Sequence, residues 1–281
     1  MVQQETRITF SNLDRILYPG PGISKKEVIE YYIRIAPLMI PYLRERHLTT
    51  RRFPEGVGSG GFYQKAAPRT APEWVRTDTW DGIRYIICND PETLIWLANL
   101  AAIEIHTPLS RVSSIDTPDV AYFDIDPEPP ATFRDACRVA RLLKRLLDEL
   151  NIHSYPKTSG KKGIHVAVPL RGGYTFREVR DFVHGIGRIM GDQDEQVRSE
   201  LSDSREPATV FIDYLQNSSG KTMVCPYSLR AEAMATVSTP LEWSDLRGDL
   251  RAEDFHIGTI RSREVDPWSG IFTDPQEIVV R

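Results

Sequence analysis

The chain has 281 residues, a length that predicts one large domain or two small ones. Its apolar share of 41% and charged share of 26% are typical of a folded globular protein and exclude a largely disordered chain. With 35 basic and 39 acidic residues the formal charge is −4, which excludes a uniformly basic surface, so any nucleic-acid site must be a local basic patch.

The N-terminal part of the chain predicts two helices with a loop between them. Ser24 and Glu27 have the spacing of a capping box, and apolar residues at helical spacing follow, so we expect a helix over residues 24–36. The Gly- and Pro-rich residues 54–61 predict a loop. Apolar residues three and four positions apart predict a second helix over about 91–105.

The second half of the chain predicts alternating strands and helices. Strands are expected at residues 120–126, 153–157, 164–168 and 209–214, and helices at 132–150 and 175–190. The inner face of the first of these helices is predicted to consist of Ala136, Val139, Leu143, Leu146, Leu147 and Leu150. Its solvated face is predicted to carry Arg134, Arg138, Arg141 and Arg145. We therefore expect an α+β fold in one domain over residues 1–281, with lobes of about 1–115 and 116–281.

Two carboxylates end the strand predicted over 120–126. Asp124 and Asp126 are two positions apart, so they share one face of that strand while Ile125 points into the core. Carboxylates this close repel each other unless a cation lies between them, and oxygen ligands suit Mg²⁺ or Mn²⁺. Asp213 ends a similar apolar run, so if the two strands are neighbours, three carboxylates converge as ligands for two divalent ions. The alternatives are capping, turn or surface positions.

Residues 157–165, with the sequence KTSGKKGIH, form a polar turn between the acidic strands. Two glycines allow close approach of the backbone, and N–H groups and lysines can face a polyphosphate. The spacing of a Walker A loop is absent. His165 is expected to face a cleft, since it alternates with two apolar residues. We interpret the segment as a triphosphate-binding turn; the alternative is an exposed hairpin with solubilising lysines.

Lys25 and Lys26 occupy the first turn of the helix predicted over 24–36, where the helix dipole disfavours cations. A bound anion would make these positions favourable, because the free N–H groups and the lysines would all face it. A phosphate group is the natural candidate. The alternative is a pair of solvated lysines.

An aromatic pair stands beside a cation in a Gly-rich part of the chain. Phe62, Tyr63 and Lys65 would suit stacking on exposed bases, and Arg51 and Arg52 add positive charge nearby. The alternative is that the two aromatic rings belong to the hydrophobic core. The sequence leaves both interpretations open.

Taken in order, these motifs resemble the polymerase domain of bacterial ligase D (LigD), a member of the archaeo-eukaryotic primase superfamily. The resemblance rests on Asp124-x-Asp126, on residues 157–165, and on Phe211-Ile212-Asp213-Tyr214 with Gln216 and Asn217. Further matching segments are residues 12–19 (NLDRILYP), 62–65 (FYQK), 103–106 (IEIH), 226–230 (PYSLR) and 237–241 (VSTPL). The resemblance covers nearly the whole chain and implies a two-lobed catalytic core of mixed and antiparallel sheets flanked by helices.

The resemblance also implies a function and a set of site residues. It implies template-directed nucleotidyl transfer that fills gaps and extends ends in non-homologous end joining, favouring ribonucleotides. Two divalent ions, Mn²⁺ or Mg²⁺, would be held by Asp124, Asp126 and Asp213. The implied nucleotide-binding residues are His106, Lys157, Ser159, Lys162, His165, Gln216 and Arg230. The implied DNA-binding residues are Arg15, Lys25, Lys26, Arg51, Arg52, Phe62, Tyr63 and Lys65.

Two of these positions depart from the family's usual pattern. Arg15 stands where the family more often has lysine in the pocket for a downstream 5′-phosphate, a change that keeps the charge. Phe62-Tyr63 stands where the family often has two phenylalanines, a change that keeps two rings available for stacking.

The implied partners are DNA ends, gapped duplex with a 5′-phosphate, nucleoside triphosphates and Ku. No ligase or phosphoesterase signature accompanies the motifs, so we expect a stand-alone polymerase whose ligase and phosphoesterase are separate chains. Cys88, Cys137 and Cys225 form no CxxC pair and predict reduced thiols in a cytoplasmic protein. A role in joining DNA ends, which the resemblance implies, would make the protein nucleoid-associated. Neither a membrane span nor a signal peptide is expected from the apolar runs.

Two other functions remain as alternatives. One is a DNA primase that starts chains de novo, although the sequence has no zinc-ligand cluster of the sort many primases carry. The other is an inactive module that only bridges DNA ends. That alternative predicts damaged metal ligands, whereas all three carboxylates are intact.

Overall fold

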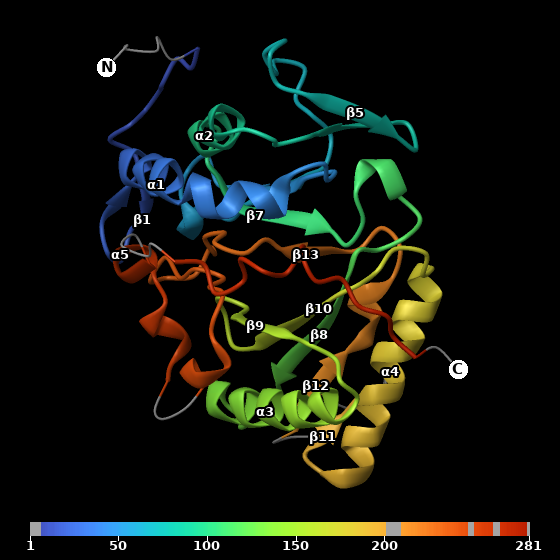
Figure 1. The fold of residues 1–281 in the computed structure, drawn as a ribbon. Coiled ribbons are helices and arrows are strands. Elements are labelled where there is room, and N and C mark those ends of the chain that lie inside the picture. The colour runs from blue at the N-terminus through green and yellow to red at the C-terminus, as the bar shows by residue number, and fades with distance from the viewer. Residues whose placement is uncertain (1–6, 201–208, 247–249, 261–264, 280–281) are drawn as a thin grey trace.

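The computed structural model describes residues 7–200, 209–246, 250–260 and 265–279. Two β-sheets face each other at its centre, with helices on their outer sides (Figure 1). One sheet has four strands, in the spatial order β13 (Thr222–Val224), β7 (Ala102–Pro108), β3 (Thr49–Arg52) and β4 (Phe62–Gln64). The other has five, in the order β11 (Val197–Arg198), β12 (Val210–Asp213), β8 (Val120–Pro127), β10 (Ile164–Pro169) and β9 (Tyr155–Thr158).

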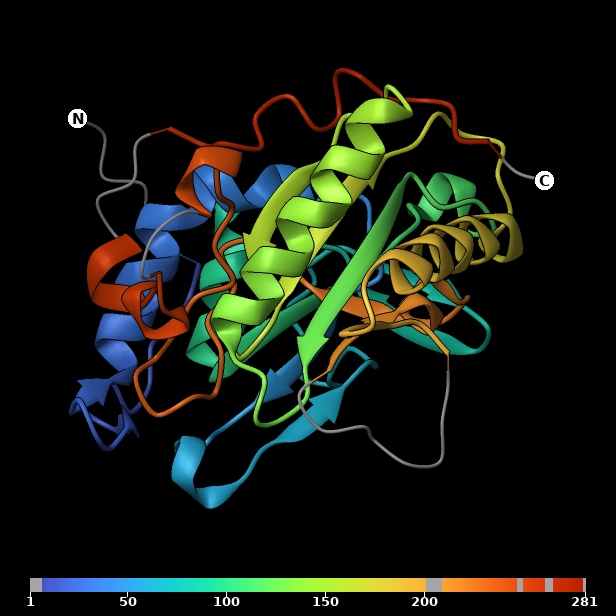
Figure 2. The same cartoon turned by 90° about the horizontal axis from the view of Figure 1, so that it is seen from below.

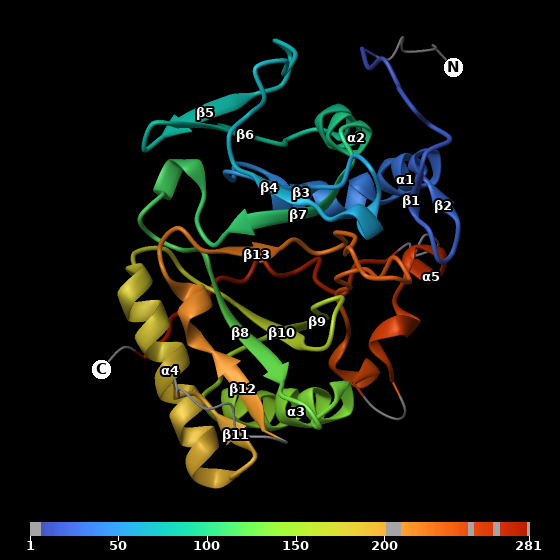
Figure 3. The same cartoon turned by 180° about the vertical axis from the view of Figure 1, so that it is seen from behind.

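Four long helices cover the two sheets. Those on the side of the four-stranded sheet are α1 (Lys25–Leu43) and α2 (Pro91–Asn99), and those on the five-stranded sheet are α3 (Phe133–Glu149) and α4 (Phe176–Gln193). Figure 2 shows α3 lying across the strands, and Figure 3 shows α1 and α2 on the opposite side of the molecule. This arrangement confirms the α+β fold with sheets flanked by helices.

Smaller elements complete the described chain. Two antiparallel ribbons are formed by β1 (Ile16–Tyr18) with β2 (Ile23–Ser24), and by β5 (Thr77–Trp80) with β6 (Ile83–Ile86). The short helix α5 is Ile257–Ile260, and 3₁₀ turns span Val57–Ser59, Val112–Ser114, Tyr214–Asn217, Trp243–Asp245 and Ala252–Asp254. No helix in the described ranges is both long and apolar enough to cross a bilayer.

Side-chain alternation along β8 separates the core from the space between the sheets. Phe123 and Ile125 pack into the hydrophobic core formed with α3 and α4. Tyr122 belongs to the other core cluster, which includes the four-stranded sheet. Because successive side chains of a strand point to opposite faces, Asp124 and Asp126 lie on the face of Tyr122. The aspartates are therefore turned toward the opposing sheet, as the spacing predicts.

The same alternation orders β7 in the opposing sheet. Ile103 and Ile105 join the hydrophobic core that includes α1 and α2. Glu104 and His106 consequently point the other way, toward the five-stranded sheet. The two sheets thus present polar side chains to each other across their shared interior, and the space between them is where chemistry can occur.

Local patterns predicted several elements well. The capping box of Ser24 and Glu27 begins α1, with Ser24 N donating to Glu27 Oε2 at 2.8 Å. The predicted strand over 120–126 corresponds to β8, and the helices predicted over 132–150 and 175–190 correspond to α3 and α4. On α3, Leu150 lies at the C-cap and is 46% exposed, so its predicted place on the inner face is wrong.

The helix predicted over about 91–105 is wrong in its second half. α2 ends at Asn99, Ala101 has a φ of 57°, and β7 begins at Ala102. Residues 103–106 of β7 do alternate between apolar and polar, but this run has only four residues, is buried, and joins the helical pattern of α2 without a polar break. Ala101 and Ile105 therefore matched a helical spacing that has no structural meaning.

The four-stranded sheet had no predicted strands. β3 consists of two threonines and two arginines, and β4 and β13 have three residues each, which is too short for a periodic pattern. β13 follows β8, β10 and β12 in sequence but pairs with β7. The four-stranded sheet, whose other strands lie before residue 109, therefore takes its last strand from residues 222–224.

Candidate active site

Three carboxylates and a histidine lie on three adjacent strands. Asp213, the last residue of β12, is directly opposite Asp124 of β8. On the other side of β8, His165 of β10 is also opposite Asp124. Residues directly opposite each other in antiparallel strands share a face of the sheet. The expectation that the two acidic strands are neighbours is confirmed, and Asp126 lies two residues farther along the same face of β8.

The ionised forms of the three carboxylates are disfavoured, mainly by burial and, for Asp126 and Asp213, also by the charge of Asp124. Burial raises the pKa of Asp124 to about 6, although the positive charge of Lys157 partly opposes this. Burial and the negative charge of Asp124 together raise the pKa of Asp126 to about 6. The same two causes raise the pKa of Asp213. A cation bound among the carboxylates would relieve this repulsion.

Asp124 also has a buried acceptor without a hydrogen bond. Its Oδ1 is buried and unpartnered, although Nε2 of His165 lies 3.1 Å away in an orientation that makes no hydrogen bond. Leaving a buried acceptor unsatisfied costs free energy. Carboxylate oxygens are the ligands that hard divalent cations prefer. The chemistry of the donor set therefore fits Mg²⁺ or Mn²⁺.

The side chains do not yet surround an ion. Among the described residues, no three His, Cys, Asp or Glu side chains are grouped closely enough to hold a metal as they stand. A bound ion would have to draw the carboxylates of Asp124, Asp126 and Asp213 toward a common point. Their role as metal ligands therefore stays a prediction.

The turn between β9 and β10 packs tightly against these aspartates. Gly160 has a φ of 73°, and a Cβ there would lie 2.5 Å from Cγ of Arg230. A Cβ on Gly163 would lie 2.5 Å from the carbonyl oxygen of Ile125 and 2.7 Å from Oδ1 of Asp126. Both glycines are thus required by close approach. They bring the turn into contact with the acidic end of β8.

Side chains of the turn are held by hydrogen bonds. Ser159 Oγ accepts from the backbone N–H groups of Lys161 and Gly163, each at 3.1 Å. Lys162 Nζ donates to the carbonyl oxygen of Pro127 at 3.0 Å, at the end of β8. The half-exposed ammonium of Lys162 therefore lies beside the carboxylate cluster, where a polyphosphate would be attracted.

Lys157 is placed differently from the other residues of this segment. It has no exposed surface, and its Nζ lies 2.9 Å from Nδ1 of His165, 2.6 Å from Oγ of Ser238 and 3.0 Å from the carbonyl oxygen of Val224. These three acceptors use all the donors of an ammonium group. Burial lowers the pKa of Lys157 to about 7. The Lys157 ammonium group contacts the His165 ring and helps to orient it. The Lys157 side chain itself does not reach the surface.

Gln216, Arg230 and His106, the remaining predicted nucleotide-site residues, border the same interior. Gln216 Nε2 donates to Asp213 Oδ2 at 2.9 Å. Arg230 Nη1 donates to the carbonyl oxygen of Ser159 at 3.0 Å, which ties it to the turn. His106 Nε2 lies 3.1 Å from Oε2 of Glu104, and burial lowers the pKa of the imidazole.

A second group of cations lies at the start of α1. Lys25 is almost fully buried, and its Nζ donates to the carbonyl oxygen of Ser11 at 2.6 Å. Burial lowers the pKa of Lys25, and the positive charges of Arg15 and Arg52 lower it further. Arg15 also pairs with Glu55. The structure thus brings Arg15, Lys25 and Arg52 together, whereas Lys26 is exposed.

The aromatic pair on β4 is exposed. Phe62 and Tyr63 have 49% and 63% of their surface accessible, so the alternative that they are core residues is wrong. The guanidinium of Arg52 lies 5.5 Å from the ring centre of Phe62, and that of Arg51 lies 5.5 Å from the ring centre of Tyr63. Lys65 is exposed just beyond them. The two rings follow each other along β4 and so lie on opposite faces of the strand, each exposed and beside its own arginine, where a base could stack.

The sequence analysis gave no role to Glu104. It is fully buried and in contact with His106, Arg51 and Arg230. The only sequence pattern that could have indicated it is an ionisable residue inside the apolar run of residues 102–105. Its partners come from three separate parts of the chain, which no local pattern reveals.

Comparisons with known proteins match this architecture. Residues 24–268 match the family model described as the LigD primase-polymerase domain. The structure resembles the polymerase domain of Mycobacterium tuberculosis ligase D in complex with DNA, with a TM-score of 0.87 and 28% sequence identity. That similarity covers 97% of this chain and 100% of the solved chain.

Two curated relatives show the same relationship in sequence. The chain is 33% identical over 276 residues to the bifunctional non-homologous end joining protein LigD of Bacillus subtilis, covering 96% of this chain and 45% of that protein. It is 33% identical over 256 residues to the multifunctional non-homologous end joining protein LigD of Mycolicibacterium smegmatis, covering 87% of this chain and 33% of that protein. The chain therefore spans less than half the length of these two relatives.

Proposed function

Because the chain belongs to the LigD primase-polymerase domain family, we propose that it is a template-directed, metal-dependent nucleotidyltransferase that fills gaps and extends ends in non-homologous end joining. The observation that carries this proposal is the meeting of β8 and β12, which sets Asp213 opposite Asp124 beside a lysine-bearing turn. An inactive bridging module would have no need for three partly or fully buried carboxylates on one face, whose raised pKa values show that their charges cost free energy when no cation is bound.

Asp124, Asp126 and Asp213 are proposed to hold two divalent cations, Mn²⁺ or Mg²⁺. When bound, such ions would lower the pKa of a primer 3′-hydroxyl and stabilise negative charge on the α-phosphate and the leaving pyrophosphate. The Asp213 carboxylate is held in place by the side chain of Gln216 and by the backbone N–H of Leu215. These two hydrogen bonds limit rotation of the Asp213 side chain at the end of β12, opposite Asp124 of β8.

The turn after β9 is proposed to bind the triphosphate of the incoming nucleotide. The charge of Lys162 acts on Asp126, and the buried Ser159 holds the backbone of the turn through the N–H groups of Lys161 and Gly163. Arg230 is tied to the turn by its hydrogen bond to the Ser159 carbonyl. His165, held by Lys157, faces Asp124. These groups would orient the phosphates so that the α-phosphate lies in line with the primer hydroxyl.

DNA contacts are proposed for the lobe of the four-stranded sheet. The grouping of Arg15, Lys25 and Arg52 supports a pocket for a downstream 5′-phosphate, because three cations around one partly buried point are tolerated best with an anion present. Lys26 would add charge at its rim. The exposed rings of Phe62 and Tyr63, with Arg51 and Lys65, are proposed to stack on template bases.

The finer features of the activity are also proposals. They comprise a preference for ribonucleotides, and cooperation with Ku, a DNA ligase and a phosphoesterase in the cytoplasm at the nucleoid. De novo primer synthesis is the alternative activity for the same site, since metal ligands and a triphosphate turn would serve both reactions.

Primer extension on a 5′-phosphorylated gapped duplex tests the proposal. Each of the eight common nucleotides is supplied singly with Mn²⁺ or Mg²⁺, and a single-stranded template without primer serves as the parallel test for priming. Templated incorporation into the gap is the expected result. Failure with every nucleotide and both metals would overturn the proposed polymerase, whereas products on the unprimed template would favour the primase alternative.

A further inference from the structure

Glu104 of β7 is a buried acid between the two sheets. Its side chain is fully buried. Oε1 accepts a hydrogen bond from the backbone N–H of Ala231 at 3.1 Å, and Oε2 lies 3.1 Å from Nε2 of His106. Burying a charge is costly unless it is compensated by hydrogen bonds and opposite charges. The neighbours of Glu104 supply both.

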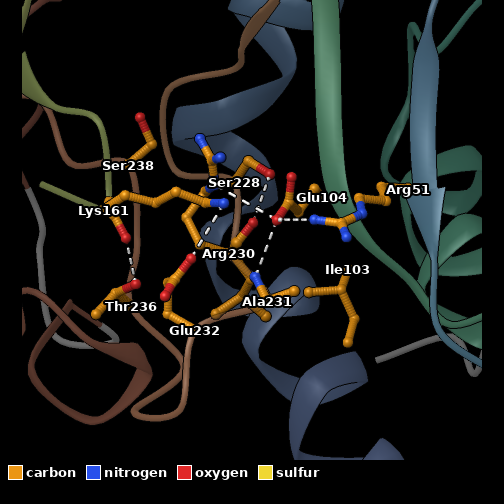
Figure 4. Close-up of polar contacts among 12 residues, drawn as sticks. Arg51, Ile103, Glu104, Lys161, Ser228, Arg230, Ala231, Glu232, Thr236 and Ser238 are labelled. Carbon is orange, nitrogen blue, oxygen red and sulfur yellow. Dashed lines mark hydrogen bonds and ion pairs between the residues drawn. The ribbon is translucent and has the colours of Figure 1, made fainter. Parts of the chain in front are cut away.

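Two arginines approach this carboxylate from opposite sides, as Figure 4 shows. Arg230 Nε lies 3.5 Å and Arg51 Nη1 lies 3.6 Å from Oε1 of Glu104. The Nε atoms of both arginines are buried and make no hydrogen bond among the described residues. The attraction between Glu104 and these arginines is therefore mainly one of charge, and Glu104 compensates two cations at once.

Contacts from these arginines reach both sides of the candidate active site. Arg230 donates to the carbonyl oxygen of Ser159 in the triphosphate turn. The guanidinium of Arg51 lies over the ring of Tyr63, and that ring meets the ring of His106 edge to face at a distance of 6.0 Å. Glu104, Arg51, Tyr63 and His106 thus form a closed circuit of contacts, and Arg230 links this circuit to the turn.

The hydrogen bond between Glu104 and His106 has a chemical consequence. Burial alone would raise the pKa of Glu104, but His106, Arg230 and the Ala231 N–H outweigh it and lower that pKa to about 2, so the group is an ionised acceptor. An ionised carboxylate can only accept, so the proton of the neutral His106 ring must be on Nε2. Nδ1 is then the unprotonated acceptor of the ring.

We propose that Glu104 is a positioning residue that fixes the tautomer of His106 and holds Arg51 and Arg230 in one arrangement. The buried carboxylate of Glu104 would then fix two parts of the site at once. Through Arg51 it would hold the ring of Tyr63 proposed to face the template, and directly it would hold His106 and Arg230, which are proposed to face the nucleotide. This inference rests on the proposed function, because it concerns how the same site holds a nucleotide opposite a template base. It adds a residue that touches neither substrate.

Glu104→Gln is the test variant, since the amide keeps the shape but removes the charge and can donate as well as accept. We expect the nucleotide KM on a gapped duplex to rise about tenfold, the effect of losing one charge-assisted interaction. The kcat at saturating nucleotide and the affinity for gapped DNA should change by less than about threefold. ¹⁵N NMR of histidine-labelled protein should show the Nε2–H tautomer of His106 in the wild type and a mixture in the variant.

Glu232→Gln is the matched control. Glu232 belongs to the same loop as Arg230 and pairs with Lys161 at 3.1 Å, but both members of that pair are partly exposed. Removing this charge should leave the nucleotide KM and the His106 tautomer unchanged, because surface ion pairs contribute little. A rise in KM equal to that of Glu104→Gln would overturn the specific role of Glu104.

Two results would contradict the inference directly. One is an unchanged nucleotide KM in a folded Glu104→Gln protein, and the other is an Nδ1–H tautomer of His106 in the wild type. Should Glu104→Gln fail to fold, Glu104→Asp keeps the charge, and its His106 must still be the Nε2–H tautomer. The NMR result needs no activity, so an inactive wild type would count against the proposed function alone.

Discussion

At the scale of single residues, the arrangement of Asp213 and Asp124 is the feature most closely tied to function. Asp213→Asn removes one negative charge from a face where the charge of Asp124 raises the pKa of both Asp126 and Asp213. We expect primer extension to fall at least a hundredfold, equivalent to about 3 kcal/mol of lost transition-state stabilisation. Binding of gapped DNA, measured by fluorescence anisotropy, should be retained.

Asp148→Asn is the control for that substitution, because Asp148 is an exposed acid on the outer helix α3. It should leave extension unchanged. Without metal, Asp213→Asn should also be at least as stable as the wild type, since it relieves repulsion with Asp124. Full extension by Asp213→Asn with Mn²⁺ would refute the assignment of this carboxylate.

Lys25 provides a second test at the residue scale. Lys25→Ala removes the most buried cation of the group that includes Arg15 and Arg52. Affinity for a gap carrying a 5′-phosphate should fall about tenfold, as expected for one charge-assisted contact. Affinity for the same gap without the phosphate should change little.

Lys26→Ala is the matched comparison for Lys25→Ala, since Lys26 is the next residue in the same turn but is exposed. Its effect should be smaller on both DNA substrates, because an exposed charge is screened by solvent and salt. Equal losses on phosphorylated and unphosphorylated gaps for Lys25→Ala would argue against a phosphate pocket at this position.

At the scale of secondary-structure elements, α4 supports the five-stranded sheet without contributing a residue to the candidate active site. It begins with a capping box in which Thr175 Oγ1 accepts from the N–H of Glu178 and the Glu178 carboxylate accepts from the N–H of Thr175. The helix packs on the face of the five-stranded sheet that points away from the carboxylates. Its role is therefore to bury that face.

Thr175→Ala should lower the stability of the protein without changing its chemistry. Loss of an N-cap side chain costs about 1 kcal/mol, which urea unfolding monitored by circular dichroism would measure as a lower midpoint. The nucleotide KM and kcat should equal those of the wild type at temperatures below unfolding. A selective loss of kcat in the folded variant would mean that α4 affects the site more directly than its packing indicates.

At the scale of the whole molecule, positive and negative side chains are gathered at two separate sites, one in each lobe. The net charge of −4 is combined with a local group of cations at the start of α1 and a local group of acids on β8 and β12. Folding therefore brings like charges together at two sites. Ligands of opposite charge would stabilise the folded state at both.

Metal ions provide the corresponding prediction. Millimolar Mn²⁺ or Mg²⁺ should raise the melting temperature, because a cation bound only by the folded state stabilises it by RT ln(1 + L/Kd), where L is the free metal concentration. Differential scanning fluorimetry would measure the shift, and EDTA should reverse it. In Asp213→Asn the shift should be reduced or absent, whereas in Asp148→Asn it should equal that of the wild type. An identical shift in all three proteins would place metal binding elsewhere.

Local sequence patterns predicted those features that depend on neighbouring residues. The capping box at Ser24 and the amphipathic pattern of α3 depend on spacings of three or four residues. The shared face of Asp124 and Asp126 follows from the two-residue period of a strand. These features need no knowledge of the rest of the chain.

Tertiary structure alone decided how these pieces meet. Asp213 lies opposite Asp124 because β12 pairs with β8, Lys157 is buried because β13 and the segment after it cover it, and Glu104 meets arginines from two distant segments. The error at β7 has a related cause, because its short alternation at residues 103–106 also continues the helical spacing of α2, and only the fold shows that the chain turns at Ala101. Contacts between residues far apart in sequence leave no periodic trace, because they are selected by the free energy of packing the whole chain.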